Sequence, residues 1–199
     1  MPLRTASNES ALIGNKFEYC INTILFQRGV YPPEDFTAVK KYGLNMLVSQ
    51  DDQVKAYIKK IMSQLNKWML KSKISKLIIV ITSKETGENV ERWQFDVCRE
   101  KADDQSWSES EVQQEIQSIF RQITASVTFL PMLDGNCTFN VLVYADADSE
   151  VPLEWGDSDA REIRDAEKVQ LRSFSTNSHR VDTLVSYRHV MLVTVVFDT

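Results

Sequence analysis

The sequence contains few of the residues on which disulfide and metal chemistry depend. Its 199 residues include three cysteines, two histidines, six glycines and five prolines. The cysteines, Cys20, Cys98 and Cys137, are odd in number and far apart, so they fit neither a disulfide framework nor a zinc site with closely paired ligands. We therefore expect reduced intracellular thiols, with no metal and no cofactor.

The shortage of glycine and histidine also limits the enzyme classes that the chain could belong to. The scattered glycines form neither a P-loop nor a dinucleotide-binding fingerprint. A histidine-based hydrolase would need His179 or His189, and both lie in the C-terminal region that we expect to be least rigidly placed. Such a hydrolase is an alternative whose activity would disappear when either histidine is replaced. We expect a protein that is not an enzyme.

An excess of basic charge and long apolar runs are missing as well. Lysine and arginine number 23 against 28 acidic residues, which gives a formal net charge of -5. Without a dense basic run, we expect no nucleic-acid partner. No stretch approaches the ~20 apolar residues of a membrane span, and the N-terminal residues MPLRTASNES lack the apolar core of a signal peptide. We expect no membrane association and a location in the cytoplasm or nucleus.

The remaining composition is typical of a folded protein. Hydrophobic residues make up 43% of the chain and charged residues 26%, which excludes a wholly disordered or collagen-like chain. A chain of this length can bury one substantial core but is short for two. We expect one domain over residues 1–199, in which residues 1–15 are flexible.

A first helix is predicted by apolar residues at three- and four-residue spacing. The pattern runs from Phe17 to Leu25 and ends at Gly29, because the chain cannot continue as a helix past Pro32. We expect this helix to be short and to start near Lys16.

Two more helices have clearer start signals. Asp51 is a suitable N-cap for a long amphipathic pattern that continues to Met69. Ser108, followed three residues later by Glu111, fits a capping box at the start of a third helix, which ends before Pro131. The buried face expected for the third helix comprises Val112, Ile116, Ile119, Phe120, Ile123 and Val127.

Alternating and continuous apolar patterns predict the strands. Leu44 to Val48 suggests a short strand or small hairpin at the periphery, and Leu77 to Ile81 is apolar on both faces, as in a central strand. Val90 to Cys98 and Thr138 to Ala145 alternate as half-buried strands do. Three further β-type segments lie near the C-terminus, at Val169 to Thr176, Val181 to Tyr187 and Val190 to Phe197. Helices on one face of a largely antiparallel sheet form an α+β fold.

An acidic segment from Asp146 to Glu167 interrupts these patterns. It holds nine acidic and two basic residues without an apolar period. It also lacks the ligand spacing of a calcium loop, so a functional or mobile loop is the better interpretation. Trp155 lies within it, where a large aromatic side chain must dock onto something. This residue either pins the loop to the domain or fastens the loop over a ligand.

Several segments resemble the HORMA family, and within it the spindle-checkpoint branch. They occur in the order found in that family, and the similarity runs from about Phe17 to Tyr187. The resemblance implies three helices on a three-stranded sheet and a C-terminal "safety belt" that moves between two edges of the sheet; belt and C-terminal tail together are residues 146–199 here. The segments that carry the resemblance are FQRGVYPPEDF (Phe26 to Phe36), YGLNMLV (Tyr42 to Val48), ERWQFD (Glu91 to Asp96), RQITASVTFLP (Arg121 to Pro131) and VQLRSFST (Val169 to Thr176).

The resemblance further implies how such a protein works. An extended partner peptide would pair with an edge strand while the belt, from Val151 to Thr176, crosses over it. The edge-strand residues so implied are Phe139, Asn140, Val141, Leu142, Val143 and Tyr144, and those of the belt are Val151, Pro152, Trp155, Leu171 and Phe174. The implied partners of this trapping site are a coiled-coil checkpoint scaffold and the co-activator of the anaphase-promoting complex.

A second surface is implied on the third helix. Members of the family pair one conformer with another and bind an antagonist through this helix, and an AAA-type ATPase remodels them. The matching positions are Arg121, Gln122 and Phe129, with Arg172 from the segment after the acidic loop. The resemblance places the protein in nucleus, kinetochore and cytoplasm.

Two departures and one rival accompany the resemblance. Residues Met1 to Ile13 lack the apolar lead-in usual in the family, and His189 to Thr199 adds an apolar, β-prone tail. The rival is the HORMA subunit of a translesion DNA polymerase, which traps a different peptide by the same physics. The segments ERWQFD and VQLRSFST favour the checkpoint branch.

Overall fold

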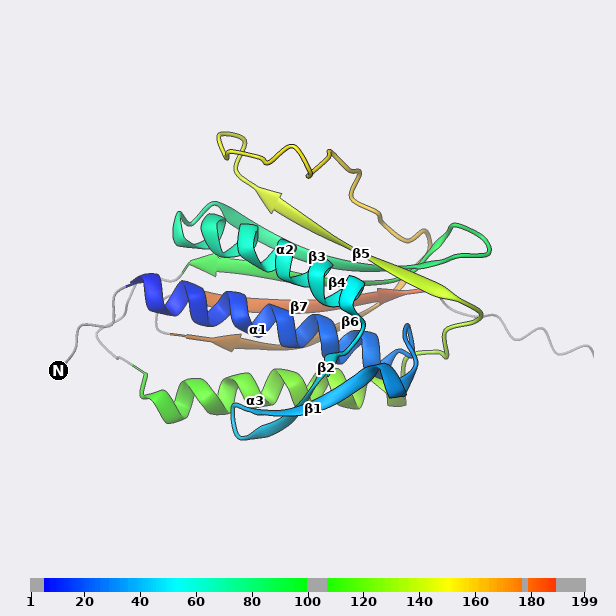
Figure 1. The fold of residues 1–199 in the computed structure, drawn as a ribbon, viewed down its shortest axis with the longest axis horizontal. Helices are drawn as coiled ribbons and strands as arrows, with labels where there is room; N and C mark the ends of the chain where they lie inside the picture. Colours follow the sequence, from blue (N-terminus) through cyan, green and yellow to red (C-terminus); the bar gives the residue numbers. More distant parts are fainter. Residues whose placement is uncertain (1–5, 100–106, 177–178, 189–199) are drawn as a thin grey trace, which may run out of the picture.

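The computed structural model describes residues 6–99, 107–176 and 179–188, and within these ranges three helices cover one face of a five-stranded antiparallel sheet (Figure 1). A separate two-stranded hairpin lies beside the helices. The helices are α1 (Ala6–Gln27), α2 (Asp52–Leu70) and α3 (Glu109–Ala125), with two short 3-10 turns at Pro33–Asp35 and Ser126–Thr128. The strands are β1 (Phe36–Lys41), β2 (Leu44–Ser49), β3 (Ile74–Ser83), β4 (Asn89–Arg99), β5 (Cys137–Ala145), β6 (Glu167–Ser175) and β7 (His179–Tyr187).

Two helix starts follow directly from their capping residues. The Asp51 carboxylate accepts hydrogen bonds from the backbone N–H groups of Gln53 and Val54, at 2.8 and 2.9 Å. Ser108 and Glu111 form the reciprocal capping box at the start of α3. Each interaction satisfies backbone donors that the first turn of a helix leaves without a partner. Both predicted starts are confirmed.

The first helix is longer than the sequence pattern predicted. It begins at Ala6 and not near Lys16. The apolar face defines only the part that packs on the core, from Phe17 onward. Residues 6–15 contain no proline, and Gly14 is buried beside Asn66 of α2, so the helix extends from the packed turns towards the N-terminus without a second nucleation step. The prediction of a start near Lys16 was wrong for this reason.

The end of α3 differs in a similar way. The α-helix ends at Ala125 and continues as a 3-10 turn over Ser126–Thr128. The tighter winding of a 3-10 turn changes which residues face the core. Val127, predicted to be buried, is 40% exposed, and Leu130 is buried instead. The other residues predicted for the buried face of α3 are buried.

The sheet has the strand order β5-β3-β4-β7-β6, and all its pairings are antiparallel. Leu77 to Ile81 of β3 is buried on both faces, as predicted for a central strand. The three strands β5, β3 and β4 form the frame implied by the resemblance, and the β6–β7 hairpin adds two more at the β4 edge. The third C-terminal strand predicted, Val190 to Phe197, lies outside the described residues.

A buried ion pair ties the end of α1 to the sheet. Arg28 Nε lies 2.9 Å from Glu91 Oε2, and both side chains are almost completely buried. Trp93 Nε1 donates to Glu91 Oε1 at 2.6 Å, and the guanidinium also donates to the backbone carbonyl of Pro131. Burial raises the pKa of the Glu91 carboxyl, and the Arg28 charge opposes that shift. The helix layer, the sheet and the chain after α3 therefore meet at one charged cluster.

None of the helices in the described part of the chain is long and apolar enough to span a bilayer.

Candidate functional site

Strand β5 lies at an edge of the sheet, and its outward backbone groups can be identified from one hydrogen bond. The N–H of Lys84 donates to the carbonyl of Asn136 at 2.8 Å, just beyond the paired strands. Lys84 and Asn136 therefore form a hydrogen-bonded pair. Hydrogen-bonded and non-bonded residue pairs alternate along an antiparallel ladder, so every second residue of β5 counted from Asn136 faces β3. The backbone groups of Phe139, Val141 and Val143 therefore point away from β3, to the side where no described strand pairs with β5.

Side chains of β5 divide between the two faces of the sheet. Phe139 and Val141 are buried against the helix layer, and Val143 packs at its border. The opposite face carries Asn140 and Tyr144, which are exposed. Since unpaired edge groups act as a template for strand addition, the predicted edge residues form a surface on which an extended chain can pair. Leu142 completes the edge strand and is half-buried.

The segment after β5 starts with strong anchors. Residues 146–166 contain neither helix nor strand, as the acidic composition predicted. The ammonium of Lys73 lies 2.7 Å from an oxygen of Asp148 and 3.5 Å from one of Asp146. Trp68 Nε1 donates to the carbonyl of Glu150 at 3.0 Å. These contacts fix the direction in which the chain leaves β5.

Trp155 makes the next anchor. Its ring meets that of Trp68 edge to face, with 5.0 Å between the ring centroids. Of the two interpretations of Trp155, the contact that pins the loop to the domain is therefore present. Pro152 is half-buried between these anchors, whereas Val151 is 57% exposed.

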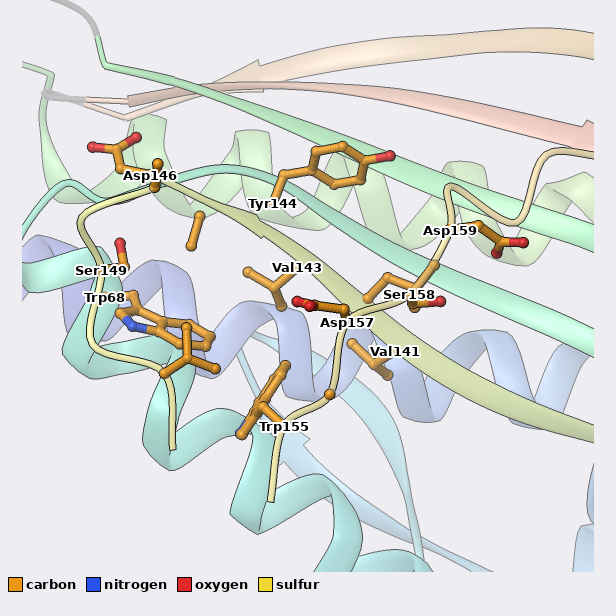
Figure 2. A pocket seen from close by; sticks show the side chains of 15 residues that line it. Trp68, Val141, Val143, Tyr144, Asp146, Ser149, Trp155, Asp157, Ser158 and Asp159 are labelled. Carbon is orange, nitrogen blue, oxygen red and sulfur yellow. The ribbon is translucent and has the colours of Figure 1, made fainter. Parts of the chain in front are cut away.

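A pocket of about 410 Å³ lies between the β5 edge and the anchored segment (Figure 2). Figure 2 shows Val141 and Val143 on the strand side and Trp155 and Asp157 on the loop side. The pocket is therefore bounded along one side by unpaired backbone and along the other by the belt. Its lining comprises Trp68, residues 141–147, Ser149, Val151 and residues 155–159.

Further along, the belt crosses the face of the sheet that the helices leave uncovered. The buried Arg92 of β4 holds it there: its Nε donates to the carbonyl of Ala160 at 3.1 Å and its guanidinium lies 3.4 Å from Glu162. Ile163 is buried at the same crossing. The sequence reasoning missed Arg92, although a charged residue between the core residues Glu91 and Trp93 of a central strand needs a polar partner.

The hairpin β6–β7 ends the belt on the far side of the sheet. Leu171 and Phe174 of β6 are buried, at 8% and 1% exposure, and a bulge separates them. The bulge frees the backbone N–H of Arg172, which donates to Gln122 Oε1 of α3 at 2.6 Å. Two of the residues predicted for the helix interface thus touch.

The other two predicted interface residues are exposed, and Arg121 lines a hollow together with residues 44–47 of β2. The side chain of Arg121 is exposed and bonded to Gln117, and Phe129 is 42% exposed. Arg172 also lies 3.4 Å from Glu115. The structure therefore joins Gln122 and Arg172 at the α3–β6 contact, whereas Arg121 lies beside β2. Across the described ranges, no group of three or more His, Cys, Asp or Glu side chains is placed to hold a metal.

Known proteins share this architecture and much of this sequence. The family model described as the HORMA domain matches residues 10–179. The mitotic spindle checkpoint component mad2 of Schizosaccharomyces pombe is 59% identical over 197 residues, which cover 94% of this chain and 97% of the relative. The human mitotic spindle assembly checkpoint protein MAD2A is 43% identical and 92% of each chain is covered.

A solved structure gives the same result. One chain in a crystal structure of the mitotic checkpoint complex is 62% identical and superposes with a TM-score of 0.87, covering 92% of this chain and 99% of that one. These relatives favour the checkpoint branch over the translesion-polymerase alternative. The chain belongs to the HORMA family, in its spindle-checkpoint branch.

Proposed function

We propose that this protein is a spindle-checkpoint adaptor that traps an extended partner peptide between the β5 edge and its belt. In doing so it helps to inhibit the co-activator of the anaphase-promoting complex. The observation that carries the proposal is the 410 Å³ pocket, which has unpaired strand backbone on one side and the anchored belt on the other. The adaptor works by binding, without an enzymatic step of its own.

The binding physics supports a tight complex. A peptide that enters the pocket and extends along the β5 edge would pair with the outward N–H and C=O groups of Val143, Val141 and Phe139. Each neutral hydrogen bond contributes about 0.5–1.5 kcal/mol net. The belt then limits escape, because it is held at Trp68 and again at Arg92. Closing a loop of some twenty residues costs only about 2–3 kcal/mol beyond a constant, which a few of these bonds offset.

Two partners fit this mechanism: the coiled-coil checkpoint scaffold and the co-activator. The relative of known structure is part of a mitotic checkpoint complex, which supports an equivalent assembly for this chain. The relatives are spindle-checkpoint components, which supports a role at kinetochores during mitosis; nucleus and cytoplasm are the other locations that we propose. The whole chain, residues 1–199, acts as one HORMA domain in this proposal.

A second face would serve regulation. Gln122 and Arg172 are joined at the α3–β6 contact, and this contact, with the exposed Arg121 and Phe129, is the face on which a second copy in the other conformer, or an antagonist, could dock. Since Arg172 reaches α3 only when β6 is paired as it is here, this surface reports the position of the hairpin. A remodelling ATPase of the AAA type would return the hairpin to its other position.

Amide hydrogen exchange with partner peptides tests the trapping mechanism. Overlapping synthetic peptides from the scaffold and the co-activator are added to the full-length chain, and exchange is followed at residues 138–145 and 146–176. Strand addition and belt closure predict slower exchange in both segments with a cognate peptide, and no change with scrambled versions. Unchanged exchange at saturating concentrations of every peptide would contradict the proposal.

A further inference from the structure

We propose that Gln94 is a positioning residue for the belt, because it holds the guanidinium of Arg92 in the orientation that binds Ala160 and Glu162. Gln94 belongs to β4, outside the predicted belt and edge strand, and acts on the belt through Arg92. The proposal rests on belt closure over a trapped peptide and names a residue that controls how long the belt stays closed.

The guanidinium of Arg92 divides its donors between the belt and β4. On the belt side, Nε donates to the carbonyl of Ala160 at 3.1 Å, and Nη2 lies 3.4 Å from Oε1 of Glu162. On the strand side, Nη1 donates to Oε1 of Gln94 at 2.7 Å. Because the guanidinium is planar, its donors have fixed mutual directions, so a contact at Nη1 also aims Nε and Nη2. The Arg92 side chain is only 3% exposed, so little water is available to replace a lost contact.

The orientation of the Gln94 amide is set by the next polar residue on the same face of β4. Its Nε2 donates to Oδ2 of Asp96 at 2.8 Å. A carboxylate accepts hydrogen bonds and cannot donate one, so it binds the amide nitrogen and leaves the amide oxygen facing Arg92. Lys76 of β3 lies opposite Asp96 in the register, with 3.2 Å between Nζ and Oδ1. This ion pair holds the carboxylate where it can fix the amide.

The same contacts continue to the peptide-binding edge. Lys76 also lies opposite Tyr144 of β5, and its ammonium is 5.8 Å from the centroid of the tyrosine ring. Tyr144 lines the pocket. The row of contacts from the pocket to the belt anchor therefore runs in the order Tyr144, Lys76, Asp96, Gln94 and Arg92. Replacing Gln94 interrupts this row at its contact with the anchor.

Side-chain exchange in the free protein gives the first test. In Gln94→Met the side chain keeps its length but cannot accept from Nη1, so the Nε–H of Arg92 is expected to exchange with water about 2–10-fold faster, the range of one hydrogen bond. The Nε–H signal is assigned by its absence from the spectrum of Arg92→Gln. Gln117→Met is the matched control, because the amide of Gln117 also makes a hydrogen bond, to the carbonyl of Tyr42 in the helix layer. Equal Nε–H exchange in wild type and Gln94→Met would overturn the positioning role.

Peptide release gives the second test, with the labelled scaffold or co-activator peptide that protects β5 most in the exchange experiment. Gln94→Met is expected to speed dissociation about 2–10-fold relative to wild type and Gln117→Met. In the Arg92→Gln background the same change should have no further effect, because Gln94 acts through Arg92. Unchanged release in Gln94→Met, or an equal acceleration in both backgrounds, would overturn the proposal. If wild type binds none of the peptides, the trapping function fails, whereas the Nε–H exchange still decides whether Gln94 positions Arg92.

Discussion

At the scale of single residues, the Arg28–Glu91 pair has the largest predicted effect on stability. Glu91→Gln removes the counter-charge and leaves a buried guanidinium facing an amide. Loss of one partner of a buried ion pair costs about 3–5 kcal/mol, because the remaining charge stays out of water. We expect the free energy of unfolding, measured with urea, to fall by that amount.

A matched variant separates burial from charge. Glu88 pairs with Arg188, but both side chains are largely exposed, at 51% and 41%. Water screens this pair, so Glu88→Gln should leave the unfolding curve nearly unchanged. Equal effects of Glu88→Gln and Glu91→Gln would show that the buried cluster has no special role.

Arg92 is the residue whose loss should loosen the belt while the strands stay paired. In Arg92→Gln the carbonyl of Ala160 loses a charged donor, a bond worth about 1.5–3 kcal/mol. A trapped peptide should therefore dissociate at least tenfold faster, measured by chasing a labelled peptide with unlabelled peptide. Arg180→Gln, which changes an exposed arginine bonded to Asp182, should leave the dissociation rate unaltered; a slow rate in Arg92→Gln would argue against this anchor.

The residues predicted from sequence and those found at the site differ for a physical reason. Phe139 to Tyr144 and Trp155 could be predicted, because a strand pattern and an isolated aromatic can be recognised along the chain. Arg92 could not, because its role depends on which loop packs against it. That contact joins Arg92 and Ala160, which are 68 positions apart in the sequence.

At the scale of elements, the start of the belt is held by charge, and its pH dependence can be derived. The hydrogen bond from Lys73 lowers the pKa of Asp148 below its ordinary 3.8, and Asp148 in turn raises the pKa of Lys73 above 10.5. A lowered carboxyl pKa stabilises the folded state above the ordinary value and loses that contribution as the pH falls through the folded value. A raised lysine pKa stabilises below its ordinary value and loses its contribution as the pH rises through the folded one.

The start of the belt should therefore be equally protected from amide exchange between about pH 5 and pH 9, because this range lies above the pKa of Asp148 and below that of Lys73. Amide exchange at residues 146–152, corrected for the intrinsic pH dependence of exchange, measures this. Lys73→Gln should raise exchange there throughout the window and abolish its sensitivity to salt. Lys76→Gln is the control, since Lys76 pairs with Asp96 of the sheet. A protection that varies strongly inside the window would mean that another titrating group holds the belt.

Element boundaries could be predicted where a local signal exists. The capping residues fixed the starts of α2 and α3, and continuous apolar residues identified β3 as central. The start of α1 could not be found, because Ala6 to Asn15 has no core-facing pattern. Nor could the destination of β6 and β7 be predicted, since an alternating strand fits either edge of the sheet and only its packing against α3 and β4 decides.

At the scale of the whole molecule, the β6–β7 hairpin lies at the β4 edge of the sheet, opposite β5 (Figure 1). The pocket lies at the β5 edge. Any arrangement with the hairpin elsewhere must first break the β4–β7 ladder, which spans nine residue pairs from Glu91 to Arg99. Interconversion should therefore be slow. Small changes in how the hairpin packs can still shift the equilibrium between its positions, because the free energies of two arrangements of one segment need differ by only a few kcal/mol.

Thr183 of β7 offers such a change. Its side chain is completely buried and its hydroxyl has no hydrogen-bond partner among the described residues. An unsatisfied buried hydroxyl costs about 1–3 kcal/mol, and valine has nearly the same shape without that cost. Thr183→Val should therefore favour the arrangement in which the hairpin pairs with β4. Its population, relative to any arrangement in which water reaches the residue 183 side chain, should rise by about fivefold or more. Two sets of amide resonances in slow exchange would report the ratio.

Thr82→Val makes the same chemical change where the sheet does not rearrange. The Thr82 hydroxyl donates to Asn89 Oδ1 at 3.1 Å, across the β3–β4 turn that both arrangements share. Its loss should lower the free energy of unfolding and leave the ratio of arrangements as it is in wild type. A shift of the ratio away from the docked hairpin in Thr183→Val would contradict this prediction. The Thr183 hydroxyl would then be better hydrogen-bonded with the hairpin at β4 than in any other arrangement, and polar contacts rather than the buried apolar face would hold the hairpin there.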